Sequence, residues 1–229
     1  MIAVPAERHQ RPPLAVVFDM DGLLLDSERL ALHTFIAACR EFRFEPNLDV
    51  YRKCIGATYG VTEEILRREL GPGFPFEAVY ASWSRRYDQH VHFRPLDIKP
   101  GAVELLQVLH DSGTPLALAT STRRPTAEKK LELARLDHFF QELVCGGETT
   151  HGKPYPDPYL KACELLNVSP EGCWAFEDSM NGTRAALAAG LTVFQIPDLI
   201  EPGGGERALG QAILPSLHDA LAHWKSLRN

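Results

Sequence analysis

The sequence predicts a doubly wound α/β fold, in which a parallel sheet carries helices on both of its faces. Short apolar runs recur along the chain, and stretches with helical periodicity lie between them. These runs lack the strict alternation of half-buried strands, as expected for parallel strands that are covered on both sides. A helical region after the first run interrupts the pattern once. We therefore expect an α/β domain with a helical insertion.

Short apolar runs account for the expected strands. They are LAVVF (14–18), LALAT (116–120), ELVC (142–145), CWAFE (173–177) and TVFQI (192–196). The helix expected at 101–113 places Val103, Leu106 and Leu109 on one face and ends at Gly113. Further helices are expected at 125–136, 156–166 and 179–190, each between two of the strands.

Residues 27–94 contain no convincing strand and have the pattern of three or four amphipathic helices. The helical stretches are SERLALHTFIAACREF, VTEEILRREL and EAVYASWSRRYDQHV, with Pro and Gly in the loops. We predict two domains, a sheet domain formed by 1–26 and 95–229 and a helical domain formed by 27–94. The crossings near 25–27 and 94–97 are the expected hinges.

Composition and charge limit the class of protein. The 229 residues are 45% hydrophobic, and 24 basic against 30 acidic residues give a net charge of −6. We expect no nucleic-acid partner, because such proteins show clustered Lys and Arg and a high pI, whereas this chain has a pI near 5.8. A small anionic ligand is compatible with these numbers, because local charge decides its binding.

The chain is expected to be cytoplasmic. Its first 13 residues hold no apolar stretch long enough for a signal peptide, and no run approaches the ~18 apolar residues of a membrane helix. The five cysteines are odd in number and form no CxxC pair, which favours buried, reduced thiols. We expect no membrane partner, and a monomer or a weak homo-oligomer.

Polar groups follow four of the expected strands. Because the site of an open α/β sheet lies outside the carboxyl ends of its strands, these groups should meet at one edge. They are Asp19-Met20-Asp21, Thr120-Ser121-Thr122, Lys153 in the loop GKPYPDP, and Glu177-Asp178. Each alone has a simpler interpretation, such as a turn, a helix N-cap or a solvated charge. The prediction depends on all four occurring in this order.

The carboxylates of this set suit a divalent cation. Asp19, Asp178 and Glu177 offer hard oxygen ligands, which Mg²⁺ prefers together with water and substrate phosphate. The cation and Lys153 would offset the repulsion between the carboxylates. The sequence therefore predicts Mg²⁺ as the cofactor at this edge.

The same residues could transfer a phosphoryl group. Asp19 could attack phosphorus and form an aspartyl-phosphate, while the Thr120 hydroxyl and nearby backbone N–H groups hold the phosphate oxygens. Asp21 could protonate the leaving oxygen and later deprotonate water. Gly22 would let the chain turn sharply beside the site.

Four segments resemble the motifs of the haloacid dehalogenase-like (HAD) superfamily. FDMDGLLLDSE resembles the first motif, LALATST the second, GKPYPDPY the third and AFEDSMNGTRAALAAG the fourth, over about residues 14 to 197. The helical insertion is similar to the small cap of the subfamily that includes β-phosphoglucomutase, phosphoglycolate phosphatase and pseudouridine-5′-phosphatase. This resemblance implies a Rossmann-like core with an inserted helical-bundle cap.

The resemblance also implies a role for each motif residue. Asp19 would be the nucleophile, and Asp21 the acid and base whose backbone carbonyl also binds Mg²⁺. Phosphate would be bound by Thr120, Ser121 and Lys153, and Lys153 would bridge phosphate and nucleophile. The metal site would be completed by Asp178 and Glu177. An Asp at position 21 favours phosphoryl transfer over dehalogenation, because haloacid dehalogenases lack this second acid.

Within the subfamily, the sequence is most similar to the pseudouridine-5′-phosphatase-like group and its sugar-phosphatase relatives. The β-phosphoglucomutases typically carry a Lys-Gly step in the cap, followed closely by an Arg for the distal phosphate of the substrate. Here Ile55 precedes Gly56, and Tyr59 lies near the place of that Arg. The cap of this chain thus lacks the charge to hold a second phosphate.

We therefore predict a Mg²⁺-dependent phosphatase that hydrolyses a small phosphate monoester through an aspartyl-phosphate. Its partner would be a small phosphorylated metabolite, of the sugar phosphate or nucleoside 5′-monophosphate type. One alternative is a β-phosphoglucomutase-like phosphomutase. Another, from a different class, is a non-catalytic regulator that binds a phosphorylated metabolite.

Four further residues are candidates for substrate binding. Glu28 opens the first helix of the insertion, where it serves equally well as an acid at a helix start. Thr58 and Tyr59 lie in the Gly-flanked stretch GATYG, for which a flexible turn is an equal alternative. Arg123 follows the second motif, where a solvated helix start is the simpler interpretation.

Overall fold

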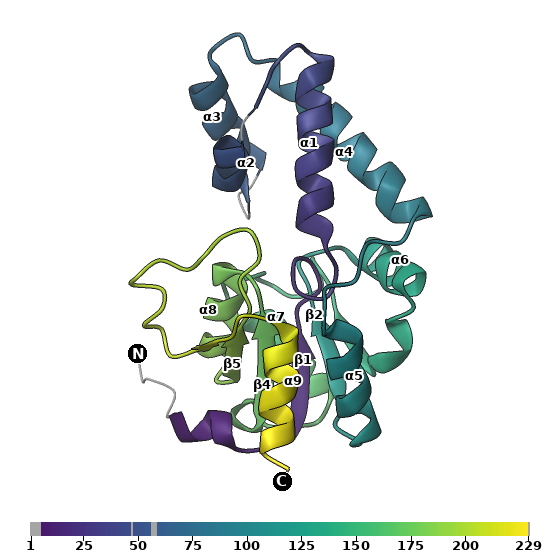
Figure 1. Cartoon of the computed structure of the whole chain (residues 1–229), viewed down its shortest axis with the longest axis vertical. Helices are drawn as coiled ribbons and strands as arrows, with labels where there is room; N and C mark the ends of the chain where they lie inside the picture. Colours follow the sequence, from purple (N-terminus) through teal and green to yellow (C-terminus); the bar gives the residue numbers. More distant parts are fainter. Residues whose placement is uncertain (1–5, 47, 56–58, 229) are drawn as a thin grey trace. The chain divides into compact units, whose positions relative to one another are not determined.

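A computed structural model describes residues 6–46, 48–55 and 59–228 of the chain. The chain divides into two compact units (Figure 1). The sheet unit combines Met1–Asp26 with Asp97–Asn229, and the helical unit is Ser27–Leu96.

The sheet unit is built on parallel strands in the order β3-β2-β1-β4-β5-β6. The strands are β1 (Ala15–Phe18), β2 (Leu116–Ala119), β3 (Glu142–Val144), β4 (Cys173–Glu177), β5 (Thr192–Gln195) and β6 (Ala212–Ile213). The predicted α/β fold class is confirmed, and all five predicted strands are present. The edge strand β6 lies outside the prediction, because it has only two half-buried residues and is too short to leave a pattern.

Helices connect the strands and cover the sheet. They are α5 (Ala102–Asp111), α6 (Arg124–Ala134), α7 (Asp157–Leu165), α8 (Met180–Ala188) and α9 (Leu217–Ser226), with 3₁₀ segments η1 (Ala6–Gln10), η2 (Asp137–Phe139) and η3 (Pro170–Gly172). Helices α5 to α8 correspond to the predicted ones, whereas α9 and the 3₁₀ segments lie outside the prediction.

The two faces of the sheet bury different side chains. One face packs against α7 and α8 through small side chains, among them Ala175 of β4 and Ala162 and Ala185 of the helices. The opposite face carries an aromatic stack, formed by Phe18, Trp174, Phe176, Phe194 and Trp224. Both faces are therefore dry, which explains why the strands read as apolar runs without alternation.

The helical unit consists of α1 (Ser27–Glu41), α2 (Leu48–Cys54), α3 (Tyr59–Leu70) and α4 (Phe76–Phe93). Helices α1 and α4 pack along each other. The rings of Phe35 and Trp83 lie 5.1 Å apart across this contact. The Ser82 hydroxyl of α4 donates a hydrogen bond of 2.6 Å to Glu41 of α1.

The two crossings between the units lie side by side. The backbone N–H of Asp26 donates to the carbonyl of Asp97 at 2.8 Å, and Leu25 and Ile98 form an antiparallel bridge. The return crossing follows Leu96, two residues beyond the limit expected at 94, because pairing with the outgoing chain begins only at Asp97.

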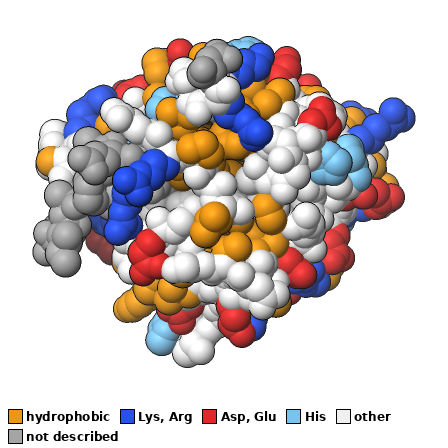
Figure 2. Space-filling model, turned by 90° about the horizontal axis from the view of Figure 1, so that it is seen from below, with side chains coloured by type: hydrophobic (Ala, Val, Ile, Leu, Met, Phe, Trp, Pro, Cys, Tyr) orange, Lys and Arg blue, Asp and Glu red, His pale blue; other side chains and the backbone are white. Residues whose placement is uncertain are grey.

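One face of the molecule and the state of the cysteines are typical of a globular protein. Figure 2 shows one face, on which acidic and basic side chains are interspersed around a central group of hydrophobic ones. All five cysteines are buried free thiols. Within the described ranges, the helices are too short or too polar to cross a membrane.

Candidate active site

The carboxyl ends of three neighbouring strands carry the predicted polar residues. Asp19 follows β1, Thr120 follows β2, and Glu177 ends β4. Since β1 pairs in parallel with both β2 and β4, these residues lie at one edge of the sheet. Backbone hydrogen bonds hold two of them there: Asp19 N–H donates to Phe176 at 3.0 Å, and Thr120 N–H donates to Val144 at 2.9 Å.

Three carboxylates gather at this edge. One oxygen from each of Asp19, Glu177 and Asp178 lies within 4.8 Å of the others. Asp19 and Glu177 are buried, so their mutual repulsion is little screened by water. Gly22 has a φ of +84°, and a Cβ at this position would overlap the Asp178 carboxylate. The loop after β1 therefore packs directly against the cluster, which is compatible with a divalent metal ion.

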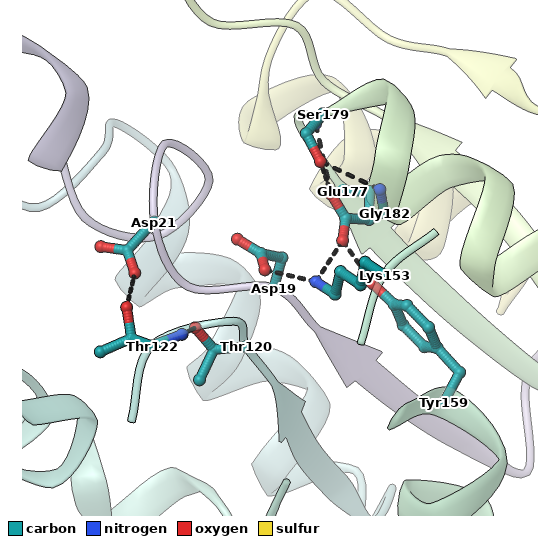
Figure 3. Close-up of polar contacts among 9 residues, drawn as sticks. All are labelled: Asp19, Asp21, Thr120, Thr122, Lys153, Tyr159, Glu177, Ser179 and Gly182. Carbon is teal, nitrogen blue, oxygen red and sulfur yellow. Dashed lines mark hydrogen bonds and ion pairs between the residues drawn. The ribbon is translucent and has the colours of Figure 1, made fainter. Parts of the chain in front are cut away.

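The side chain of Lys153 places an ammonium group next to the carboxylates of the cluster. Its Nζ lies 2.5 Å from Asp19 Oδ1 and also donates to Glu177 Oε1 (Figure 3). The Lys153 side chain is only 5% exposed. One ammonium group thus serves two buried carboxylates.

Donors from three directions orient the Glu177 carboxylate. The Tyr159 hydroxyl donates to Oε1 at 2.6 Å, and Ser179 donates to Oε2 through its backbone N–H at 3.2 Å and its hydroxyl at 3.0 Å. Ser179 is also the N-cap of α8, where its side chain accepts from Gly182 N–H (Figure 3). A Cβ at Gly182 would collide with the Glu177 carboxylate. The end of β4 and the start of α8 are therefore joined by hydrogen bonds and close packing around the Glu177 carboxylate.

The cluster changes the ionisation of its members. Burial raises the pKa of Asp19, the carboxylates of Glu177 and Asp21 add to this rise, and Lys153 opposes it, so that the pKa is about 7. Burial lowers the pKa of Lys153, but the carboxylates of Asp19 and Glu177 outweigh this effect and raise it above its usual value. Burial also raises the pKa of Tyr159, which keeps its hydroxyl a donor. A nearby divalent cation would lower the pKa of Asp19.

Asp21 has a different set of partners from Asp19. Thr122 Oγ1 donates to Asp21 Oδ2 at 2.6 Å, and Lys130 Nζ donates to Oδ1 at 2.7 Å. Figure 3 shows the Asp21 carboxylate turned toward Thr122 and away from Asp19. Two aspartates that are separated by one residue are thus held by two different lysines.

The turn after β2 presents the predicted phosphate-binding residues. Thr120 is buried. Its hydroxyl oxygen accepts a hydrogen bond of 3.1 Å from Thr122 N–H, and this bond does not use the hydroxyl proton. Ser121 is exposed. Gly146 lies against the Ser121 carbonyl, where a Cβ would overlap it. The segment that follows β3 therefore packs against the backbone of this turn.

Comparison with known proteins assigns the chain to a family. The family model described as haloacid dehalogenase-like hydrolase matches residues 16–196. The chain belongs to the haloacid dehalogenase-like hydrolases. The predicted superfamily is confirmed, and the four motifs of this hydrolase lie at the edge of the sheet described above.

Individual relatives of the hydrolase are phosphatases by name. It is 36% identical over 191 residues to a probable pseudouridine-5′-phosphatase from Drosophila melanogaster, with 80% of each chain covered. It is 33% identical over 177 residues to a phosphorylated carbohydrates phosphatase from Thermotoga maritima, which covers 77% of this chain and 82% of the relative.

A solved structure of similar fold comes from Deinococcus radiodurans. This HAD family hydrolase with bound phosphate and sodium has a TM-score of 0.81 and 25% sequence identity to the present hydrolase. The match covers 95% of this chain and 97% of that chain.

Three of the four additional substrate-binding candidates of the hydrolase lie among the described residues, each in a different environment. Glu28 lies in the first turn of α1, where it accepts a hydrogen bond of 3.1 Å from the Tyr51 hydroxyl. Tyr59 begins α3, is 48% exposed and packs edge-on against Tyr80 at 4.7 Å. Arg123 is the exposed N-cap residue of α6. Thr58 lies outside the described residues.

Sequence reasoning missed three residues that contact the carboxylates of this site: Lys130, Tyr159 and Ser179. A signal for the first was present, because Lys130 shares the apolar face of α6 with Ala127 and Leu131 at helical spacing. Its neighbour Lys129 is 36% exposed, whereas the Lys130 side chain is 2% exposed. A lysine on the buried side of a helix needs a partner.

Proposed function

We propose that this enzyme hydrolyses a small phosphate monoester with the help of Mg²⁺ and through an aspartyl-phosphate at Asp19. The chain is a phosphoric monoester hydrolase of the haloacid dehalogenase-like family. The observation that supports the mechanism best is the buried cluster in which Lys153 pairs with Asp19 beside Glu177 and Asp178.

The donor set fits a divalent cation. Asp19, Glu177 and Asp178 offer hard carboxylate oxygens within 4.8 Å of one another. Asp19, Asp178, the Asp21 backbone carbonyl and Glu177 would hold Mg²⁺. When bound, the ion would reduce the negative charge that the phosphate presents to an anionic nucleophile.

The first chemical step forms the aspartyl-phosphate. A carboxylate oxygen of Asp19 attacks phosphorus as the bond from phosphorus to the ester oxygen breaks. Asp21 gives a proton to that leaving oxygen, so that the alcohol departs neutral. Lys153, Thr120 and Ser121 hold the phosphate oxygens by hydrogen bonds and charge.

The second step regenerates the enzyme. Asp21, now ionised, accepts a proton from water as the water oxygen attacks phosphorus, and the bond between phosphorus and Asp19 breaks. Inorganic phosphate leaves, and Asp19 and Asp21 return to their starting states.

The substrate class follows from the relatives and the helical unit. The names of two relatives point to a nucleotide-like and a carbohydrate phosphate, and we propose a sugar phosphate or a nucleoside 5′-monophosphate. We further propose that the helical unit acts as the cap that selects the ester and excludes water.

A phosphate-release screen over phosphorylated metabolites tests the proposal. We expect release with Mg²⁺, none after chelation, and none from Asp19→Asn. Activity that survives in Asp19→Asn, or that ignores divalent metal, would rule out the mechanism. Conversion of glucose 1-phosphate to glucose 6-phosphate without free phosphate would establish the mutase alternative.

A further inference from the structure

We propose that a cavity in the sheet unit binds a small phosphorylated and hydroxylated metabolite at a second site, away from the carboxylate cluster. The cavity has a volume of about 210 Å³ and lies near the amino ends of β4 and β5, whereas Glu177 lies at the carboxyl end of β4. Its lining includes Arg8, Arg11, Leu14, Glu171, Trp174 and Thr192. The first three precede residues 16–196, which the family model matches. Part of the cavity wall is therefore built outside the motifs of the family.

A docked segment presents the two arginines on one side. Arg11 directly follows the 3₁₀ segment η1, and its backbone N–H continues the pattern of that segment by donating to the Arg8 carbonyl at 3.4 Å. Side chains three residues apart eclipse one another in such a helix. His9 fixes the segment, because its carbonyl accepts a hydrogen bond of 2.6 Å from His223 of α9 and its ring packs edge-on against Phe194 at 5.0 Å. Both arginines are thus placed before any ligand binds, which lowers the entropy cost of binding.

Neither guanidinium group forms an ion pair within the described ranges. Arg8 donates to the Gly190 carbonyl at 3.3 Å, which uses one of its five N–H groups and leaves its charge. The side chain of Arg11 is exposed and makes no hydrogen bond there. Glu171 is the one carboxylate of the lining, and the Ser169 hydroxyl and the charge of Arg8 hold its pKa below the usual value. Two arginines and one glutamate leave the cavity positive, on a chain whose net charge is −6.

A buried hydroxyl without a partner also lines the cavity. Thr192 of β5 is paired in register with Trp174 of β4. Thr192 is 2% exposed, and its hydroxyl makes no hydrogen bond with the described part of the chain. Buried polar groups normally have a hydrogen-bond partner, which a ligand in the cavity would provide. Trp174 and Leu14 add apolar surface beside this hydroxyl.

The donors of the cavity favour a phosphate group over a carboxylate. Two guanidinium groups and the Thr192 hydroxyl come from separate segments, so they suit a group whose oxygens point in several directions. A tetrahedral phosphate has this shape, whereas the two oxygens of a carboxylate lie in one plane, and Arg binds phosphate strongly. Glu171 can only accept hydrogen bonds. The rest of the ligand should therefore carry a hydroxyl group and no second anion.

Phenylglyoxal, which modifies exposed arginines, tests the site directly. With a chelator present to prevent turnover, glycerol 3-phosphate should slow the modification of Arg11, read by mass spectrometry of the peptides. The rate should fall about tenfold at a concentration ten times the Kd, because only the free protein reacts. Arg184 is the internal control, since it is a 50% exposed arginine of α8 outside the cavity. Its rate of modification should not change.

Thr192→Val tests the role of the hydroxyl. The concentration of glycerol 3-phosphate that gives half of the protection should rise about tenfold, as expected for the loss of a hydrogen bond to a charged group. Thr183→Val is the matched control, because the Thr183 hydroxyl is buried without a partner in α8, outside the cavity. It should leave the protection unchanged. Neither substitution should lower the Tm, since neither removes a hydrogen bond of the described chain.

The outcomes separate this inference from the proposed function. A rate of Arg11 modification that glycerol 3-phosphate does not change, or equal effects of Thr192→Val and Thr183→Val on the protection, would overturn the inference. Glycerate that protects as well as glycerol 3-phosphate would overturn the preference for phosphate. A lack of phosphate release from every ester would overturn the proposed function alone, because protection of Arg11 requires neither metal nor turnover.

Discussion

At the scale of single residues, the different roles proposed for Asp19 and Asp21 agree with their separate counter-ions. Lys153 holds Asp19 within the carboxylate cluster, whereas Lys130 and Thr122 hold Asp21 outside it. Neither lysine is exposed by more than a few per cent. The proposed nucleophile and the proposed acid can thus lie two positions apart without sharing one proton.

We predict that Lys130→Met lowers kcat for phosphate release by about 10- to 100-fold, the cost of a hydrogen bond between charged groups. The reason is that Asp21 loses the cation that defines its resting orientation. Lys129→Met is the matched control, because Lys129 is partly exposed and pairs with Glu132 on the surface of α6. Equal effects of the two substitutions would contradict a role for Lys130.

The raised pKa of Asp19 makes the metal-free chain less stable at high pH. A carboxyl group with a pKa of about 7 in the folded chain and about 4 in the unfolded chain binds its proton more tightly when folded. Its contribution to stability is complete below pH 4 and is lost as the pH rises to about 7 and above.

Urea unfolding of the metal-free chain at several pH values measures whether stability falls as the pH rises. At pH 8 Asp19→Asn should be more stable than the wild type, and the difference should shrink at pH 5. Mg²⁺ at pH 8 should stabilise the wild type more than Asp19→Asn. A difference in unfolding free energy that does not vary with pH would refute the assigned cause.

At the scale of elements, the junction between β4 and α8 is the most constrained part of the site. Ser179 caps the helix and binds Glu177 at the same time, and Gly182 leaves the space that the Glu177 carboxylate occupies. A small residue is required here because of a tertiary contact, since helix propensity alone would favour Ala.

We predict that Gly182→Ala destabilises the fold and abolishes phosphate release, because the new methyl group displaces Glu177. Gly60→Ala is the control, since Gly60 lies in α3 with open space where its Cβ would be. This control should keep its activity and gain about 0.5 kcal/mol in stability. Thermal unfolding and phosphate release measure both effects, and a harmless Gly182→Ala would contradict the described packing.

At the scale of the whole molecule, the helical unit is an insertion whose ends meet. The hydrogen bond from Asp26 to Asp97 brings the two crossings together, so the sheet unit closes on itself without the inserted helices. Its two dry faces are covered by its own helices. The core is therefore expected to fold independently.

Replacement of 27–96 by Asn-Gly tests this independence, because a two-residue turn suits adjacent antiparallel chains. The shortened protein should unfold cooperatively and should retain weak Mg²⁺-dependent hydrolysis of a small ester. It should lose the preference for one phosphorylated metabolite over another. A product without a cooperative transition would show that the core depends on the helical unit.

Local patterns were sufficient to predict the strands β1 to β5, the helices α5 to α8 and the helical insertion. The reason is that apolar periodicity and Gly or Pro stops act over a few residues. The motif residues could be predicted to meet because strand ends of a parallel sheet share an edge. The helix α9 carries such a signal, since Ser216 is its N-cap and Leu217, Ala220, Leu221 and Trp224 are buried at helical spacing, but the prediction left it out. The strand β6 has only two residues, and its position depends on pairing with β5.

The sequence by itself determined the fold class, the family resemblance and the residues Asp19, Asp21, Thr120, Lys153, Glu177 and Asp178 at one edge. Only the tertiary structure decided which lysine neutralises which aspartate and why Gly182 is small. These features arise from contacts between segments far apart in the chain, whose distances and orientations no local pattern specifies.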